Sequence, residues 1–136
     1  MIYLLDTNAF TDIMREHPRM IARLEGLPTD DRVVICSIVR GEILYGINRL
    51  SPGKRQQDLS SKAENIFAAL LCEPVPEAAA DHYASVKNTR LKKGLSMDEN
   101  DLWIAATALH VGACLVTRDH DMQQIDGLIV ADWTTP

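Results

Sequence analysis

The chain has 136 residues and a formal net charge of −5, with 24% charged and 46% hydrophobic residues. This length and composition predict one domain over residues 1–136, whose core needs neither disulfides nor a structural metal. The net negative charge excludes a broadly basic nucleic-acid surface, and no apolar run approaches the roughly 20 residues that a membrane helix requires.

Short apolar runs alternate along the chain with longer segments of helical periodicity. In chain order, the predicted strands or extended segments are Ile2–Leu5, 33–36, a piece around Val75, 113–117 and Ile129–Ala131. The predicted helices are 8–15, 18–25, 38–50, 54–71, 77–93 and 98–111, with a short helical turn over 122–125. This alternation predicts an α/β fold with a mainly parallel central sheet of four to five strands flanked by helices.

Local signals mark several helix ends. Ser37 is the expected cap of the helix over 38–50. Ser96 and Glu99 have the spacing of a capping box at the start of the helix over 98–111. Gly94 and Gly112 directly follow predicted helices, where a left-handed residue commonly ends the helix.

The three cysteines, Cys36, Cys72 and Cys114, each lie in an apolar stretch and fit no zinc-binding pattern. We interpret them as small buried hydrophobic residues, which indicates a reducing compartment. No basic leader precedes the first apolar run, so we predict no signal peptide. The expected location is therefore the cytoplasm, with no membrane association.

Two acids follow predicted strands. Asp6 comes directly after Ile2–Leu5, and Asp119 comes shortly after the strand over 113–117. Because ligands of open α/β sheets gather beyond the carboxyl ends of the strands, both acids are well placed for chemistry. Each would also suit a turn or a helix cap, and Asp121 is close enough to take the place of Asp119.

Two further acids interrupt the apolar stripes of predicted helices. Glu42 shares its stripe with Val39, Ile43, Gly46, Ile47 and Leu50. Asp101 shares its stripe with Ile104, Ala105, Ala108 and Leu109. A carboxylate on such a face is unfavourable unless it is paired or bound to metal. The alternatives are an ion pair of Glu42 with Arg49, and an ordinary first-turn position for Asp101 near the positive end of the helix dipole.

Four carboxylates that converge would repel one another and raise one another's pKa values. A divalent cation removes that penalty, and Mg²⁺ or Mn²⁺ suits a site made only of oxygen ligands. Such a cation activates water and stabilises charge on phosphate oxygens. The residues therefore predict a metal-dependent nuclease in which Asp6, Glu42, Asp101 and Asp119 are the catalytic metal ligands.

The segments around these acids resemble the PIN-domain ribonucleases, and most of all the VapC-type toxins of bacterial toxin–antitoxin pairs. The matching segments are YLLDTN, SIVRGEILYGI, DENDLWIAATAL and LVTRDHDMQQIDGLIVADW. Each is only a few residues around an acid, but together their order and spacing cover essentially the whole chain. The resemblance therefore implies a single PIN-like domain.

The resemblance also assigns roles to residues. The four acids of the family fall on Asp6, Glu42, Asp101 and Asp119. Asp98 and Asp121 lie near enough to the third and fourth positions to contribute as well. Polar positions that line the family's pocket, and that would support the ligating acids, fall on Thr7, Asn8 and Thr117.

The family's properties complete the expectation. The resemblance implies a Mg²⁺-dependent endoribonuclease that acts on tRNA or another structured RNA and forms a homodimer. It also implies neutralisation by a cognate VapB-like antitoxin. Antitoxins of this kind insert a peptide into the active-site groove, often with an arginine directed toward the acids.

Basic residues that could hold RNA are few. The densest basic segment ends the helix over 77–93, and Arg118 adjoins Asp119. The RNA contacts expected from this pattern are Arg90, Lys92, Lys93 and Arg118. The alternative for the first three is a solvated helix end, where cations complement the helix dipole.

Two other functions fit parts of the pattern. One is a phosphotransfer or phosphatase domain that phosphorylates Asp6, but Asn8 stands where haloacid-dehalogenase-type sites have a second Asp. The other is a non-catalytic dimeric RNA-binding module. Such a module has no need of four unfavourably placed carboxylates, so the nuclease is the leading prediction.

Overall fold

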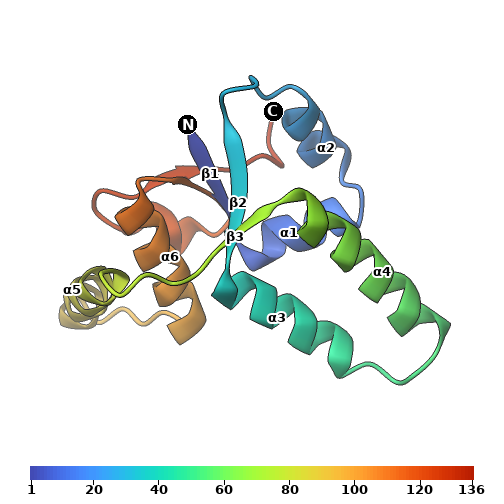
Figure 1. Cartoon of the computed structure of the whole chain (residues 1–136). Helices are drawn as coiled ribbons and strands as arrows, with labels where there is room; N and C mark the ends of the chain where they lie inside the picture. The colour runs from blue at the N-terminus through green and yellow to red at the C-terminus, as the bar shows by residue number, and fades with distance from the viewer.

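The computed structural model describes residues 1–136, which form one five-stranded parallel sheet covered by helices (Figure 1). The strands are β1 (Ile2–Leu5), β2 (Arg32–Cys36), β3 (Leu71–Glu73), β4 (Cys114–Val116) and β5 (Ile129–Ala131). Their order across the sheet is β3-β2-β1-β4-β5, and every neighbouring pair is parallel. The expected α/β fold with a parallel central sheet is confirmed.

The strand order reverses direction between β1 and β4. The chain moves outward from β1 to β3, and then returns to add β4 and β5 on the other side of β1. In the register of this pair, Leu5 lies opposite Val116. The carboxyl ends of the two strands therefore open at a topological switch point, where ligands of such sheets bind.

Six α-helices and one short 3₁₀ helix connect the strands. They are α1 (Thr7–Met14), α2 (Pro18–Glu25), α3 (Ser37–Asn48), α4 (Lys54–Ala69), α5 (Ala79–Lys92), α6 (Glu99–Val111) and η1 (His120–Gln124). In Figure 1, α5 and α6 lie together on one side of the strands, whereas α1, α2 and α4 lie on the other. Helix α3 contacts α1, α4 and α6 and therefore links the two groups.

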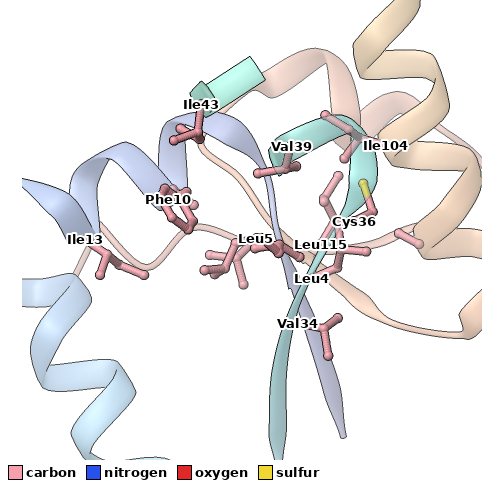
Figure 2. Close-up of a cluster of buried hydrophobic side chains, with 14 of the residues drawn as sticks. Leu4, Leu5, Phe10, Ile13, Val34, Cys36, Val39, Ile43, Ile104 and Leu115 are labelled. Atoms are coloured by element: carbon pink, nitrogen blue, oxygen red, sulfur yellow. The ribbon is translucent and has the colours of Figure 1, made fainter. Parts of the chain in front are cut away.

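The core is built around the central strand β1. Leu4 and Leu5 on this strand are both fully buried, because helices cover both faces of a parallel sheet. Figure 2 shows side chains from β1, β2, β4, α1, α3 and α6 meeting in one cluster. The labelled residues are Leu4, Leu5, Phe10, Ile13, Val34, Cys36, Val39, Ile43, Ile104 and Leu115. This packing fixes the elements that carry the acids.

Some predicted element ends are wrong. Ser37 is the first residue of α3 rather than its cap, and its hydroxyl donates to the carbonyl of Glu73. Helix α6 is capped by Asp98, not by a Ser96–Glu99 box. The extended piece expected around Val75 lies earlier, at β3, because Leu71–Glu73 pairs with β2.

Other local predictions are confirmed. Gly94 and Gly112 have φ values of +73° and +69°, so both take the left-handed conformation expected where a helix ends. All three cysteines are free thiols; Cys36 and Cys114 are buried as predicted, whereas the prediction is wrong for Cys72, which is only half-buried. None of the helices is long and apolar enough to cross a membrane.

Candidate active site

Asp6 stands at the end of β1 and begins α1. Its backbone N–H still donates to Val116 of the neighbouring strand, over 3.1 Å. Its side chain caps the helix, because Oδ1 accepts the Ala9 N–H at 2.8 Å. Only 6% of Asp6 is exposed. The alternative role of a helix cap is thus real, but it uses one carboxylate oxygen and leaves the other.

Burial raises the pKa of the Asp6 carboxyl above its usual value. The Thr117 hydroxyl, the Ala9 N–H and the charge of Arg118 oppose this change, whereas the negative charge of Asp119 adds to it. A carboxylate from the other side of the switch point therefore acts directly on Asp6.

Asp119 follows β4 and caps η1. Its Oδ1 accepts the Asp121 N–H at 2.9 Å, and its own N–H donates to the Thr117 hydroxyl at 3.1 Å. Thr117 is buried and contacts both Asp6 and Asp119. Its hydroxyl therefore lies between the two acids, and its role as a support for ligating acids stays a prediction.

Glu42 lies in the second turn of α3 and is half-buried. Its Oε1 accepts a hydrogen bond from the Thr7 hydroxyl at 2.6 Å, which ties α3 to the first turn of α1. No cation lies within ion-pair distance of Glu42, so the alternative pairing with Arg49 does not occur. Asn8 is exposed in the same first turn of α1.

Asp101 shows most directly that the acids converge. Its pKa is raised to about 6, first by burial and then by the negative charges of Asp98, Glu42, Asp119 and Asp6. Four carboxylates that are far apart in the sequence thus share one electrostatic neighbourhood at the carboxyl edge of the sheet. No three His, Cys, Asp or Glu side chains are close enough, as they stand, to chelate one ion.

The donor set of this neighbourhood fits a hard divalent cation. All candidate ligands are carboxylate or hydroxyl oxygens, as Mg²⁺ and Mn²⁺ prefer. Burial is the first cause of the raised pKa of Asp101, and the repulsion from neighbouring carboxylates that adds to it is a penalty that such a cation relieves. Binding would need a rotation of the carboxylates toward one another or bridging water molecules.

The two neighbouring acids have local structural roles. Asp98 caps α6 by accepting the Asn100 N–H at 3.1 Å. Asp121 is exposed, and its carboxylate lies 4.0 Å from Arg90 Nη2. The negative charge of Asp98 acts on Asp101. Asp119, and not Asp121, is the acid that caps η1 after β4.

The expectation that Arg90 contacts RNA is wrong. Arg90 is only 6% exposed, and its Nη2 donates to the carbonyl of Ser96 at 3.3 Å while facing Asp121. Its guanidinium therefore holds together the loops before α6 and after β4. Lys92 and Lys93 are exposed at the end of α5, and their contact with RNA remains a prediction.

A groove beside the acids was not predicted. It lies between α1, α3 and α4, has a volume of about 730 Å³, and includes Thr7 and Glu42 in its lining. Its cationic lining residues are Arg15, Arg49, Lys54, Arg55 and Lys62. Its apolar lining residues are Met14, Ile43, Ile47, Leu50 and Leu59. The only sequence signal was on α4, where Lys54, Arg55, Asp58, Leu59 and Lys62 recur at helical spacing.

A second pocket, of about 570 Å³, lies on the other side of Glu42. Thr7, Glu42, Gly46 and Arg49 line both hollows, and Asn100, next to Asp101, lines the second. Glu42 is therefore the acid that faces both the second pocket and the basic groove.

Comparison with known proteins assigns the fold to a family. A family model described as PIN domain matches residues 3–128. The chain belongs to the PIN-domain family. The PIN-domain protein Ribonuclease VapC1 of Haemophilus influenzae (strain R2866) is 34% identical over 137 residues, covering 98% of this chain and 99% of the relative. Divalent-metal dependence is general among PIN-domain ribonucleases, in agreement with the oxygen-rich site.

Solved PIN-domain structures resemble this chain along its whole length. One is VapBC2 from Rickettsia felis bound to a DNA fragment from their promoter, with a TM-score of 0.89, 30% identity, and coverage of 98% of this chain and 99% of that chain. Another is VapBC-1 from nontypeable Haemophilus influenzae, with a TM-score of 0.86, 33% identity, and coverage of 99% and 100%. The fold of the whole chain is therefore that of these PIN-domain proteins.

Proposed function

We propose that this PIN-domain protein is a metal-dependent endoribonuclease, the toxin of a toxin–antitoxin pair, and that a VapB-like antitoxin inhibits it. The observation that carries the proposal is the placement of the acids: Asp6 and Asp119 follow the neighbouring strands β1 and β4, and Glu42 accepts a hydrogen bond from Thr7, the residue after Asp6. The relatives named Ribonuclease VapC and the VapBC complexes support the choice of RNA as substrate and of an antitoxin as partner.

In this proposal, Asp6, Glu42, Asp101 and Asp119 hold Mg²⁺ (or Mn²⁺). The cation supplies an activated water and neutralises charge on the phosphate. Three of the acids are already oriented, because one oxygen of each accepts a hydrogen bond from Ala9, Thr7 or Asp121. In this proposal the remaining carboxylate oxygens, including both of Asp101, would hold the ion. Thr7 and Thr117 would act as supports through their hydrogen bonds, and Asn8, which is exposed in the first turn of α1, would join them.

The reaction is hydrolysis of an RNA phosphodiester. The oxygen of water forms a bond to phosphorus, and the bond from phosphorus to the leaving oxygen breaks. One product ends in a phosphate monoester, and the leaving oxygen takes a proton to become a hydroxyl. An RNA strand would approach the acids through the pocket that Glu42 and Asn100 line. The substrate would be tRNA or another structured RNA, which places the activity in the cytoplasm.

The groove between α1, α3 and α4 suits the antitoxin better than RNA. Its apolar floor would bury the apolar face of an amphipathic segment, and its rim of cations would pair with acidic side chains of that segment. Because Glu42 lines the groove, a segment bound there would contact this acid and could block the site. An arginine at the end of that segment would meet the negative charge around Asp101.

We also propose that the protein forms a homodimer. Tyr45 on α3 and Leu91 on α5 are 69% and 58% exposed, and contact with a second copy would remove such apolar surface from water. Sedimentation of the purified protein at several concentrations tests this proposal. A monomer throughout the range would contradict it.

One experiment separates the nuclease from its alternatives. RNA cleavage is measured for the wild type with Mg²⁺, for the wild type with EDTA, and for Asp6→Asn, with Asp30→Asn in an exposed loop as the matched control. We expect cleavage only by the wild type with Mg²⁺ and by the control. Equal cleavage by the wild type and Asp6→Asn would refute the proposal. Acid-quenched label on Asp6 from a phosphodonor would instead support a phosphotransfer domain.

A further inference from the structure

A fifth acid, Asp12, is buried without belonging to the group of four. It lies on α1, two turns after Asp6, and is only 5% exposed. A buried carboxylate is unfavourable unless a cation and further contacts compensate for its lost hydration. Its cationic partner is Arg118, whose Nη1 lies 3.5 Å from Asp12 Oδ2.

Arg118 lies beside the catalytic acids. It stands between buried Thr117 and Asp119, directly after β4. Its side chain is 48% exposed, although its guanidinium reaches a carboxylate that is almost fully covered. Its positive charge lowers the pKa of Asp6, so the guanidinium is within electrostatic reach of that acid. A guanidinium has five N–H donors, and the contact with Asp12 leaves most of them free.

The surroundings of Asp12 prevent it from following Arg118 into solvent. Trp133 and Thr134 of the C-terminal segment line the same small cavity as Asp12 and Arg118. Trp133 is 1% exposed and forms part of the core. The Asp12 carboxylate is therefore a fixed point on the helix that also carries Asp6. Because the Arg118 guanidinium pairs with this carboxylate, its orientation relative to Asp6 is restricted.

We propose that Arg118 binds the phosphate that is cleaved, and that Asp12 is a positioning residue that holds the Arg118 guanidinium beside the acids. This inference rests on the proposed ribonuclease function and extends it to a residue outside the metal site. Four carboxylates and an RNA phosphate together carry more negative charge than one divalent ion neutralises. A fixed guanidinium supplies the missing positive charge and can donate two parallel hydrogen bonds to phosphate oxygens.

The competing role for this pair is purely structural, with Arg118 present only to neutralise Asp12. The two roles predict different results in a double-mutant cycle. The variants are Asp12→Asn, Arg118→Gln, Arg118→Lys and the double variant Asp12→Asn/Arg118→Gln. Arg19→Gln, an exposed arginine on α2 without an ion pair, is the matched control.

Three quantities are measured for each variant. The first is the split of cleavage kinetics into kcat and KM. The second is the salt dependence of binding to a labelled single-stranded RNA, with Asp6→Asn added to block cleavage. The third is the melting temperature, which reports folding independently of activity. Arg118 is half-exposed, so its variants are expected to fold even if Asp12→Asn does not.

The proposal predicts a kcat that falls about 10- to 100-fold in Arg118→Gln. Losing one phosphate contact lowers the slope of log affinity against log salt by about 0.7. Arg118→Lys keeps the slope but recovers kcat only in part, because an ammonium cannot form the paired contact. Asp12→Asn keeps the slope and lowers kcat, and the double variant is no worse than Arg118→Gln alone. The control Arg19→Gln keeps kcat.

Several results would overturn the inference. If Arg118→Gln lowers the melting temperature but leaves kcat and the salt slope unchanged, the pair is structural only. Additive losses in the double variant would show that Asp12 does not act through Arg118. Either result leaves the proposed function intact, whereas a wild-type protein that cleaves no RNA overturns the function and the inference together.

Discussion

The carboxyl edge of the sheet, called the acid edge here, carries Asp6, Glu42, Asp101 and Asp119. It adjoins the basic groove at Thr7 and Glu42, but the two regions carry opposite charge. The edge gathers four carboxylates whose charges meet at Asp101. The groove sets cations around an apolar floor. The edge is suited to chemistry on phosphate and the groove to binding a protein segment. A net charge of −5 reveals neither region, because each is local.

The two regions are also built differently. The edge is set largely by backbone register, since Leu5 lies opposite Val116 and the acids follow these two strands. The groove is set by side chains from three helices, and no strand fixes them. Changes at the edge should therefore affect catalysis and metal binding, while changes in the groove should affect the antitoxin.

The largest expected effect is that of Asp101→Asn. Removal of this carboxylate takes away a proposed metal ligand, and we expect RNA cleavage to fall about 10³-fold or more. Without metal, the variant should melt at a higher temperature than the wild type, because repulsion from Glu42, Asp119 and Asp6 is removed. Single-turnover kinetics measure the loss of cleavage, and thermal melting in EDTA measures the change in melting temperature. Glu64→Gln, an exposed acid on α4, is the matched control and should change neither.

The second effect separates the groove from the edge. Arg55→Glu combined with Lys62→Glu reverses two charges that line the groove but not the pocket beside Asn100, and we expect affinity for an acidic antitoxin segment to fall about 100-fold. Cleavage of RNA should change much less. Lys92→Glu combined with Lys93→Glu makes the same charge change at the end of α5. If this second pair weakens RNA binding instead, the sequence-based expectation for these lysines is confirmed.

The third effect is a dependence on pH at the edge. Burial and the neighbouring carboxylates raise the pKa of Asp101 to about 6, so its contribution to stability is fully present below about pH 4. That contribution is lost as the pH rises through about 6. In EDTA, the difference in melting temperature between Asp101→Asn and the wild type should therefore widen from about pH 4 to about pH 7.

Metal binding should show the opposite trend, because the ion binds the deprotonated carboxylate. Affinity for Mg²⁺ should rise by up to about tenfold per pH unit below pH 6 and then level off. Calorimetric titration at several pH values measures this trend. A flat profile would mean that Asp101 is not a ligand.

The acid edge could be predicted because each acid broke a local rule. Asp6 and Asp119 follow apolar strands, and Glu42 and Asp101 interrupt apolar helix faces. The fold followed from the same periodicities, together with the tendency of alternating strands and helices to form a parallel sheet. Sequence patterns of this kind report which residues share an element and a face.

What escaped prediction depends on contacts between distant elements. Arg90 was interpreted from the charge of its neighbours, but its environment is set by Ser96 and Asp121. Asp12 attracted no notice, because its partner Arg118 lies more than 100 residues later and nothing local marks the pair. The groove escaped prediction for the same reason, since its cationic lining residues come from three helices. Charged residues that are close in the sequence were therefore a poor guide to which charged residues lie close together in the fold.

The smallest expected effect is that of Thr7→Val, at the point where the two regions meet. This substitution keeps the shape of the side chain but removes the hydroxyl that donates to Glu42 Oε1 at 2.6 Å. Glu42 would keep its charge but lose its orientation, and metal affinity should fall about tenfold, as is usual when a supporting hydrogen bond is lost. Thr7→Ser restores the donor and should restore the affinity. An equal loss in Thr7→Ser would show that the methyl group, packed beside the groove, matters more than the hydrogen bond.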